Sequence, residues 1–399
     1  MPNGDLDGLV GGLDRPSLPE RVARVVGIAA KHAAEVDHHQ RFPREALDAL
    51  RAERLMSIAV PTSLGGEGLD LMGVIDVCYG LGKGCGSAGL IFAMHQASVA
   101  CMVRHGAGVE WYETLLKRLC AEQLLVASST TEGESGGNIR SSAAALLQAG
   151  DAIHLTRDAA VISYGAQADV IVTLARRRED GAASDQVLAA FTRENCTLQA
   201  KGNWDTLGMR GTCSGGFVMQ AEGSQSQVLP APYALIHAET MLPVAHLLWS
   251  AVWAGIAAAA LERAQAFTRN SARRNGGAPP PGARRFPSAI AKHRTLRALI
   301  ASAATAYQEA LRTETLVRSI GFQTDMALFK VEASEMAIAI VLAAMRVCGL
   351  AGYRNDGAAS VTRHLRDILS SPLMISNDRI LVDAGSASLF APIAASVFE

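Results

Sequence analysis

The sequence predicts a mainly helical α+β protein in which N-terminal helices, a central antiparallel β domain and a C-terminal helical bundle follow one another. Three changes along the chain support this prediction. Apolar residues recur at three- and four-residue steps at first, then alternate or form short runs, and finally fill long Ala-rich helical stretches. We place the domain boundaries at 1–125, 126–236 and 237–399.

The N-terminal region is predicted to be helical, with one glycine-rich interruption. Pro19 and Glu20 open a helix, because proline is tolerated in a first helical turn. The helical spacing continues in FPREALDALRAERL, stops at PTSLGGEGLD, and resumes in LMGVIDVCYGLGKG and AGLIFAMHQASVACMVRHG.

The middle and last regions differ in their apolar period. The short runs VIVTLARR, VLAAFTR and GGFVMQAEG are bounded by Gly, Asp and Asn, which is typical of antiparallel strands. Long helices then follow in LLWSAVWAGIAAAALERAQAF, IAKHRTLRALIASAATAYQEALRT and VEASEMAIAIVLAAMRVCGL. RRNGGAPPPGARRFP separates the first two of them, since consecutive prolines cannot continue a helix.

Composition and charge exclude several classes of partner. The net charge of −1 offers no field for nucleic acid or for an anionic membrane. The beginning of the chain lacks a basic and an apolar region typical of a signal peptide, and we expect no membrane-spanning run. Seven cysteines without CxxC spacing predict reduced cytoplasmic thiols, not a disulfide framework or a metal site.

Six short motifs resemble the acyl-CoA dehydrogenase family, in the family's order and over nearly the whole chain. They are PTSLGGEGL, STTEGESGGN, VISYGAQADVIV, LGMRGTCSGGF, AAMRVCGLAGY and VTRHLRD. The resemblance implies that family's fold, with an N-terminal helical domain, a central antiparallel β domain and a C-terminal four-helix bundle. It also implies a flavoprotein oxidoreductase that binds FAD.

STTEGESGGN stands where the family has its flavin-binding loop. Thr130 and Thr131 end a predicted strand, where amides and a hydroxyl can donate to the pyrimidine edge of the flavin. Gly136 and Gly137 let the backbone approach the phosphates, although Gly137 replaces the family's serine. Without the resemblance, the same residues read as a polar turn between strands.

VISYG resembles the strand whose hydroxyl reaches the reactive flavin nitrogen. Ser163 keeps that hydroxyl, whereas Val161 replaces the family's aromatic residue and leaves more room over the flavin face. The alternative is a serine on an edge strand that faces water.

The family completes each FAD site with residues of a neighbouring subunit. Its arginine corresponds to Arg273, and its glutamine and following glycine correspond to Arg346 and Gly349. An arginine can bind a pyrophosphate, yet both arginines can equally be solvated helix charges. Two departures alter the site, because Gly276 replaces a phenylalanine and Leu350 replaces a second glycine. A shared site implies a homotetramer or a homodimer.

The family's catalytic carboxylate is missing. A dehydrogenase removes a weakly acidic proton beside a thioester carbonyl, which requires a Glu in a dry pocket. The two positions that carry this Glu in the family are occupied by Ile375 and Ala245, and His246 stands where an arginine binds CoA. Asn377 replaces a threonine in the segment that touches the cofactor. The catalytic residue is therefore unknown from the sequence.

Three functions stay open. First comes oxidation of an acyl thioester at its α–β bond, with electron-transfer flavoprotein as a partner and Asp378 or Glu239 as the displaced base. Second is a monooxygenase that uses reduced flavin from a flavin reductase; its candidate polar groups are Ser370, Ser371, Ser376 and His95, the last of which can also be a core histidine. Third is a noncatalytic partner subunit of a heteromeric dehydrogenase.

Overall fold

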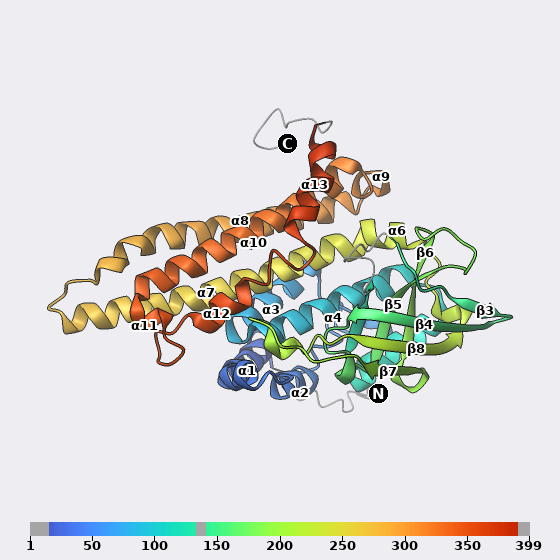
Figure 1. Ribbon diagram of the computed structural model, residues 1–399, viewed down its shortest axis with the longest axis horizontal. Coiled ribbons are helices and arrows are strands. Elements are labelled where there is room, and N and C mark those ends of the chain that lie inside the picture. The colour runs from blue at the N-terminus through green and yellow to red at the C-terminus, as the bar shows by residue number, and fades with distance from the viewer. Residues whose placement is uncertain (1–15, 133–140, 390–399) are drawn as a thin grey trace, which may run out of the picture.

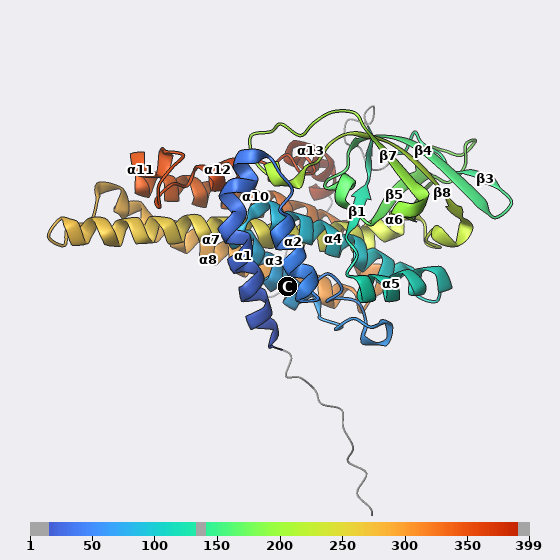
Figure 2. The ribbon, with the colours of Figure 1, turned by 90° about the horizontal axis from the view of Figure 1, so that it is seen from below.

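Helices, a β domain and a bundle of long helices follow one another along the chain (Figure 1). The computed structural model describes residues 16–132 and 141–389. The predicted fold class is confirmed. Figure 2 shows that α1 crosses the long helices, and that the β strands gather at one end of them.

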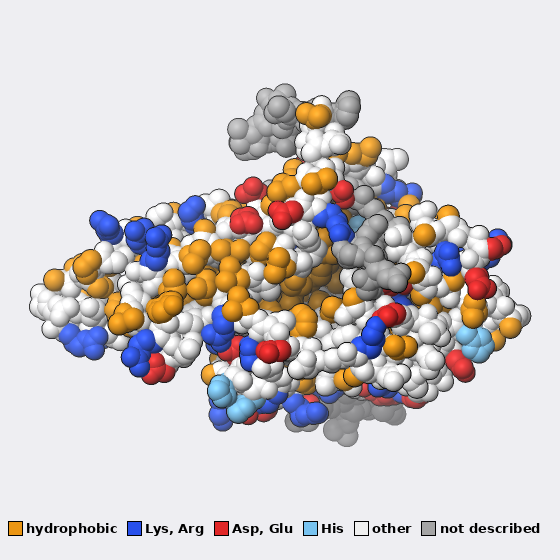
Figure 3. Space-filling view, in the orientation of Figure 1, with side chains coloured by type: hydrophobic (Ala, Val, Ile, Leu, Met, Phe, Trp, Pro, Cys, Tyr) orange, Lys and Arg blue, Asp and Glu red, His pale blue; other side chains and the backbone are white. Residues whose placement is uncertain are grey.

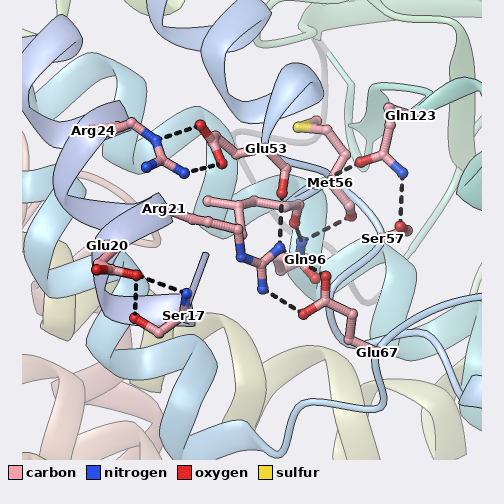
Figure 4. Close-up of polar contacts among 11 residues, drawn as sticks. Ser17, Glu20, Arg21, Arg24, Glu53, Met56, Ser57, Glu67, Gln96 and Gln123 are labelled. Atoms are coloured by element: carbon pink, nitrogen blue, oxygen red, sulfur yellow. Dashed lines mark hydrogen bonds and ion pairs between the residues drawn. The ribbon is translucent and has the colours of Figure 1, made fainter. Parts of the chain in front are cut away.

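Five helices make up the N-terminal part: α1 (Leu18–His39), α2 (Arg44–Ala52), α3 (Leu71–Gly84), α4 (Gly86–His105) and α5 (Glu110–Glu122). The side chains of Ser17 and Glu20 cap the first turn of α1. Arg21 then ties α1 to the segment after α2, because its guanidinium donates to Glu67 at 2.6 and 2.8 Å and to the Glu53 carbonyl at 2.8 Å (Figure 4).

The β domain contains two sheets with the strand orders β1-β5-β6 and β2-β4-β8-β7, and β3 pairs with β4. The strands are β1 (Val126–Ser129), β2 (Thr131–Glu132), β3 (Leu147–Ala149), β4 (Ala152–Val161), β5 (Val170–Arg176), β6 (Gln186–Thr192), β7 (Cys196–Ala200) and β8 (Phe217–Ser224). All pairs are antiparallel except β1 with β5. Parallel strands need a long crossover connection, and β2, β3 and β4 lie in the connection between β1 and β5.

The C-terminal part is built on one helical stretch, Tyr233–Arg274, which comprises α6 (Tyr233–Ile236), a π-helical segment (His237–Met241) and α7 (Leu242–Arg274). The other helices are α8 (Phe286–Ala310), α9 (Glu314–Val317), α10 (Ile320–Cys348), α11 (Leu350–Tyr353), α12 (Thr362–Ile368) and α13 (Asn377–Ser388). α7 contacts α3, α4, α8 and α10, so it lies at the centre of the molecule.

Two helical stretches have the length and hydropathy of a membrane span, which differs from the sequence-based expectation. They are Gly86–His105 and Tyr233–Arg274, and 83% and 94% of their most apolar windows are buried inside the fold. Burial of this extent is typical of core helices. The two stretches are therefore weak indicators of a membrane.

Candidate active site

A cavity of about 1030 Å³ lies where the β domain meets the long helices. Its walls come from α4, the end of β1, β4, the start of α7, α10 and the segment that enters α13. Figure 3 shows a hollow lined by hydrophobic side chains in this part of the molecule. A smaller cavity of about 370 Å³ adjoins it and shares five lining residues, Met94, Val161, Ser163, Leu373 and Met374.

Four of the predicted flavin-site residues meet in this cavity. Thr130 and Thr131 line it beside Val161 and Ser163. Strand pairing explains their proximity, because Thr131 of β2 lies opposite Val161 of β4 in the antiparallel ladder. Gly136 and Gly137 lie outside the described residues.

The backbone around Ser163 is fixed by the LGMRGTCSGGF segment. The amide of Ile162 donates to the Gly215 carbonyl at 2.9 Å, and the amide of Tyr164 donates to the Thr212 carbonyl at 2.8 Å. These two hydrogen bonds, one on each side of Ser163, fix the backbone to which its side chain is attached. The serine is thus presented to the cavity on a rigid support.

A chain of hydroxyl groups orients the side chain of Ser163. Thr212 Oγ1 lies 2.8 Å from both the Met209 carbonyl and Ser214 Oγ, so its one proton can be donated to either of them. Ser214 Oγ donates to Ser163 Oγ at 2.9 Å. When Thr212 donates to Ser214 and Ser214 to Ser163, the proton of Ser163 is available for an acceptor in the cavity. Ser214 is a site residue that the sequence analysis missed.

The VTRHLRD motif holds this segment from behind. Asp367 Oδ1 accepts a hydrogen bond from the Met209 amide at 2.8 Å, and burial raises the pKa of Asp367 to about 6. Gly208 packs directly on the Arg366 backbone, where any β-carbon would overlap the Arg366 carbonyl. Three of the quoted motifs therefore build one structure around Ser163.

Both positions of the family's carboxylate are apolar parts of the cavity wall. Ile375 lines the cavity from the segment before α13, and Ala245 lines it from α7. The Ile375 segment is fixed by Lys330 of α10, whose ammonium donates to the Ile375 carbonyl at 2.7 Å. Burial lowers the pKa of Lys330 to about 7. This lysine was also missed in the sequence, where it reads as an ordinary helix charge.

Neither displaced base that we considered lines the cavity. Asp378 is exposed in the first turn of α13. Glu239 is buried in the π-helical segment and bonded to two arginines, Arg318 at 2.6 Å and Arg104 at 3.3 Å. Among the described lining residues, the one carboxylate is Asp383, which is exposed on α13. The cavity as described lacks a carboxylate in a dry environment.

The polar groups considered for a monooxygenase have mostly structural roles. His95 is buried with Nε2 2.7 Å from the Met56 carbonyl, its Nδ1 accepts from the Val126 amide, and burial lowers its pKa to about 4. Ser376 caps α13, and Ser371 is buried outside the cavity lining. Ser370 lines the smaller cavity and donates to the Asp367 carbonyl at 2.6 Å.

The remaining predicted residues do not line the cavity of this chain. Arg273 and Arg346 are exposed near the ends of α7 and α10, far from the β domain (Figure 1), and Gly349 joins α10 to α11 with φ of +59°. Asn377, which we predicted in the segment that touches the cofactor, does not line the cavity either. Its amide bonds to α10 and not toward the cavity, because Lys330 Nζ donates to its Oδ1 at 2.7 Å and its Nδ2 donates to Ser334 at 3.0 Å.

The lining residues fit an isoalloxazine ring. Ser163 offers a hydroxyl proton, Thr130 and Thr131 stand where a strand ends, and Val161 supplies a small apolar side chain. Across residues 16–132 and 141–389, no group of three or more His, Cys, Asp or Glu side chains is arranged to hold a metal ion.

Comparison with protein families agrees with this geometry. Residues 20–123 match the acyl-CoA dehydrogenase N-terminal domain, and residues 236–380 match the acyl-CoA dehydrogenase C-terminal domain. The chain belongs to the acyl-CoA dehydrogenase family.

Within the acyl-CoA dehydrogenase family, this member is similar to proteins that differ in activity. Dibenzothiophene monooxygenase of Mycolicibacterium goodii is 30% identical over 241 residues, or 57% of either chain. A probable acyl-CoA dehydrogenase of Mycobacterium leprae is 34% identical over 112 residues, or 28% of either chain. The chain thus spans just over half and about a quarter of the length of these relatives.

A solved structure extends the likeness in fold. FMN-bound TdsC of Paenibacillus superposes with a TM-score of 0.82 and 18% identity, and the match covers 95% of this chain and 98% of TdsC. The level of identity supports the shared fold alone. A flavin is nevertheless the cofactor seen in that fold.

Proposed function

We propose that this chain is a monooxygenase that uses reduced flavin, and not a dehydrogenase of acyl thioesters. The observation that carries the proposal is the apolar wall at both base positions, Ile375 and Ala245. Among the described lining residues there is no dry carboxylate to accept the α proton of a thioester. The sequence favours dehydrogenation over monooxygenation, whereas the apolar lining of the cavity supports monooxygenation. The similarity to dibenzothiophene monooxygenase supports the same conclusion.

We propose FMN as the flavin, in place of the FAD expected from the family resemblance. FMN lacks the adenine that the family's neighbouring subunit holds, and this chain has lost two residues of that site, at Gly276 and Leu350. Arg273 and Arg346 are then exposed helix charges. The FMN in the solved TdsC structure supports this choice.

The residues of the cavity have distinct tasks in an oxygenation. Bound reduced flavin supplies two electrons and two protons, so that one oxygen atom of O2 enters the substrate and the other leaves as water. Ser163, held by Ser214, directs its hydroxyl proton at the flavin edge. The apolar side chains around Met374 and Ile375 exclude water from the cavity. Exclusion of water prevents reactive oxygen species from being lost in a side reaction.

The proposed reaction determines the partners. A flavin reductase supplies reduced FMN, whereas electron-transfer flavoprotein would be needed only by a dehydrogenase. The second substrate is a small molecule that fits the cavity. We further propose a homodimer or homotetramer located in the cytoplasm, where the seven free cysteines stay reduced.

The test combines the purified protein with FMN, NADH, a flavin reductase and ¹⁸O2, and analyses a panel of heteroaromatic compounds by mass spectrometry. We expect one ¹⁸O atom in a product, and no product when the protein or the reductase is omitted. An FMN-loaded protein that oxygenates no compound, but introduces a double bond into an acyl-CoA, would contradict the proposal.

A further inference from the structure

One polar group in the cavity wall has a free hydrogen-bonding atom. His246 of α7 follows Ala245, is 3% exposed and lines the cavity. Its Nδ1 lies 3.0 Å from the Met326 carbonyl, and since a carbonyl only accepts, Nδ1 carries the proton. Nε2 is then a hydrogen-bond acceptor, and no described residue forms a hydrogen bond with it.

The same helix, α10, holds both His246 and Ile375, the residue at one position of the family's catalytic carboxylate. Met326 and Lys330 are four residues apart on α10, so they occupy one face of that helix. The first holds His246, and the second holds the Ile375 carbonyl at 2.7 Å. A single face of α10 therefore fixes both sides of the cavity at this level.

The imidazole acts here as a neutral group in apolar surroundings. Burial lowers the pKa of His246 to about 3, so the ring is uncharged over the physiological range. The lining of the cavity includes apolar side chains such as Met94, Leu242 and Met374. An acceptor left unpaired in such surroundings costs free energy that a ligand with a donor would recover.

An aromatic ring lies beside this acceptor. Trp249 is one turn further along α7, with its ring centroid 5.9 Å from that of His246. Trp249 lines the cavity, but its Nε1–H is buried without a hydrogen-bond partner among the described residues. The indole ring of Trp249 therefore adds apolar surface beside the acceptor of His246.

We propose that His246 Nε2 accepts a hydrogen bond from an N–H or O–H group of an uncharged, mainly apolar substrate. This inference rests on the proposed monooxygenase, and it names that enzyme's substrate class. The reacting carbons and carbonyl of an acyl thioester carry no such donor.

The test uses indole and benzofuran, two rings of similar size of which only indole has an N–H group. Both are titrated calorimetrically into FMN-loaded, oxidised protein, so that no turnover is needed. We expect the wild type to bind indole about 5- to 10-fold more tightly, which is the effect of one hydrogen bond. Equal affinities, or no binding of either ring, would overturn the inference.

Three variants locate the effect. His246→Asn removes the acceptor but keeps an amide N–H in reach of Met326, and the indole preference should vanish. His246→Gln places an amide oxygen near the Nε2 position and should regain part of the preference. His293→Gln is the matched control, because His293 is a buried bundle histidine bonded through Nε2 to the Ala254 carbonyl at 3.2 Å. The preference of His293→Gln for indole over benzofuran should equal that of the wild type.

The outcomes separate this inference from the proposed function. An indole preference that persists in folded His246→Asn, judged by its melting temperature, refutes the role of His246. Oxygen transfer by the same preparation is measured independently. If the preference depends on His246 but no compound is oxygenated, the binding inference stands and the monooxygenase proposal fails.

Discussion

Ser214 lies behind Ser163 and gives the hydroxyl chain its direction. In Ser214→Ala, Ser163 loses the donor that orients its hydroxyl, so we expect oxygen transfer to fall about 3- to 10-fold, as for one lost hydrogen bond. FMN affinity should change less than about twofold. Steady-state rates and FMN fluorescence titration measure the two effects.

Ser226→Ala is the control for that substitution. Ser226 is exposed just after the end of β8, its hydroxyl pairs with the Ser224 hydroxyl at 2.6 Å, and neither serine lines the cavity. We expect wild-type rates for it. Equal rates in all three proteins would show that Ser214 does not orient Ser163.

Lys330 makes stability depend on pH in a defined window. Its pKa is about 7 in the folded protein against 10.5 for a free lysine, because it is buried. The unfolded chain therefore binds more protons between these values, and the contribution of Lys330 to the free energy of unfolding increases as pH rises from about 7 to 10.5. As pH falls through 7, that contribution is lost.

Urea unfolding of the wild type and Lys330→Met at pH 7, 8 and 9 measures this dependence. The difference between the two proteins isolates Lys330 from other titrating groups. We expect the wild type to gain stability relative to Lys330→Met as the pH rises. Parallel curves would show that Lys330 keeps its ordinary pKa in the fold.

The residues of the site differ in how far the sequence predicts them. Thr130, Thr131 and Ser163 belong to local motifs, so their place in the cavity could be predicted. The roles of His246 and Ser214 could not be predicted, because their hydrogen-bond partners Met326 and Ser163 are distant in the chain. The hydrogen bonds of Asn377 to α10 could not be predicted either, because the direction of a side chain at a helix start depends on tertiary packing.

At the level of elements, the contact between α3 and α7 depends on glycine. A β-carbon at Gly255 would overlap the Tyr79 carbonyl of α3, so the two helices approach closely there. Gly255→Ala should separate them and lower the free energy of unfolding by about 1–3 kcal/mol. Chemical denaturation measures this change, and thermal melting should follow it.

Gly385→Ala provides the matched control. Gly385 also lies inside a helix, α13, but nothing lies within 4 Å of the position of a β-carbon. Alanine favours the helix there by about 1 kcal/mol, so this variant should be slightly more stable. If both variants changed stability equally, close packing at Gly255 would not be the cause.

The order of the elements was predictable because the apolar period changes at each transition. The parallel pairing of β1 with β5 was not, since periodicity does not reveal strand direction. The π-helical segment His237–Met241 was likewise hidden in a continuous helical pattern. Both depend on contacts between elements.

At the level of the whole molecule, exposed apolar side chains predict self-association. Leu350, Tyr353, Leu373 and Val382 are between 69% and 76% exposed. Figure 3 shows hydrophobic side chains gathered over the part of the surface formed by the long helices. We expect light scattering to give two or four times the chain mass of 41.9 kDa. A monomer at micromolar concentration would contradict this expectation.

The central claim is that the cavity cannot remove the α proton of an acyl thioester. Its most direct test is to mix the FMN- or FAD-loaded protein with a panel of acyl-CoAs without oxygen and to follow the flavin absorbance. Ile375 and Ala245 at the two base positions predict that the flavin stays oxidised with every thioester. Rapid bleaching by any acyl-CoA would contradict the account.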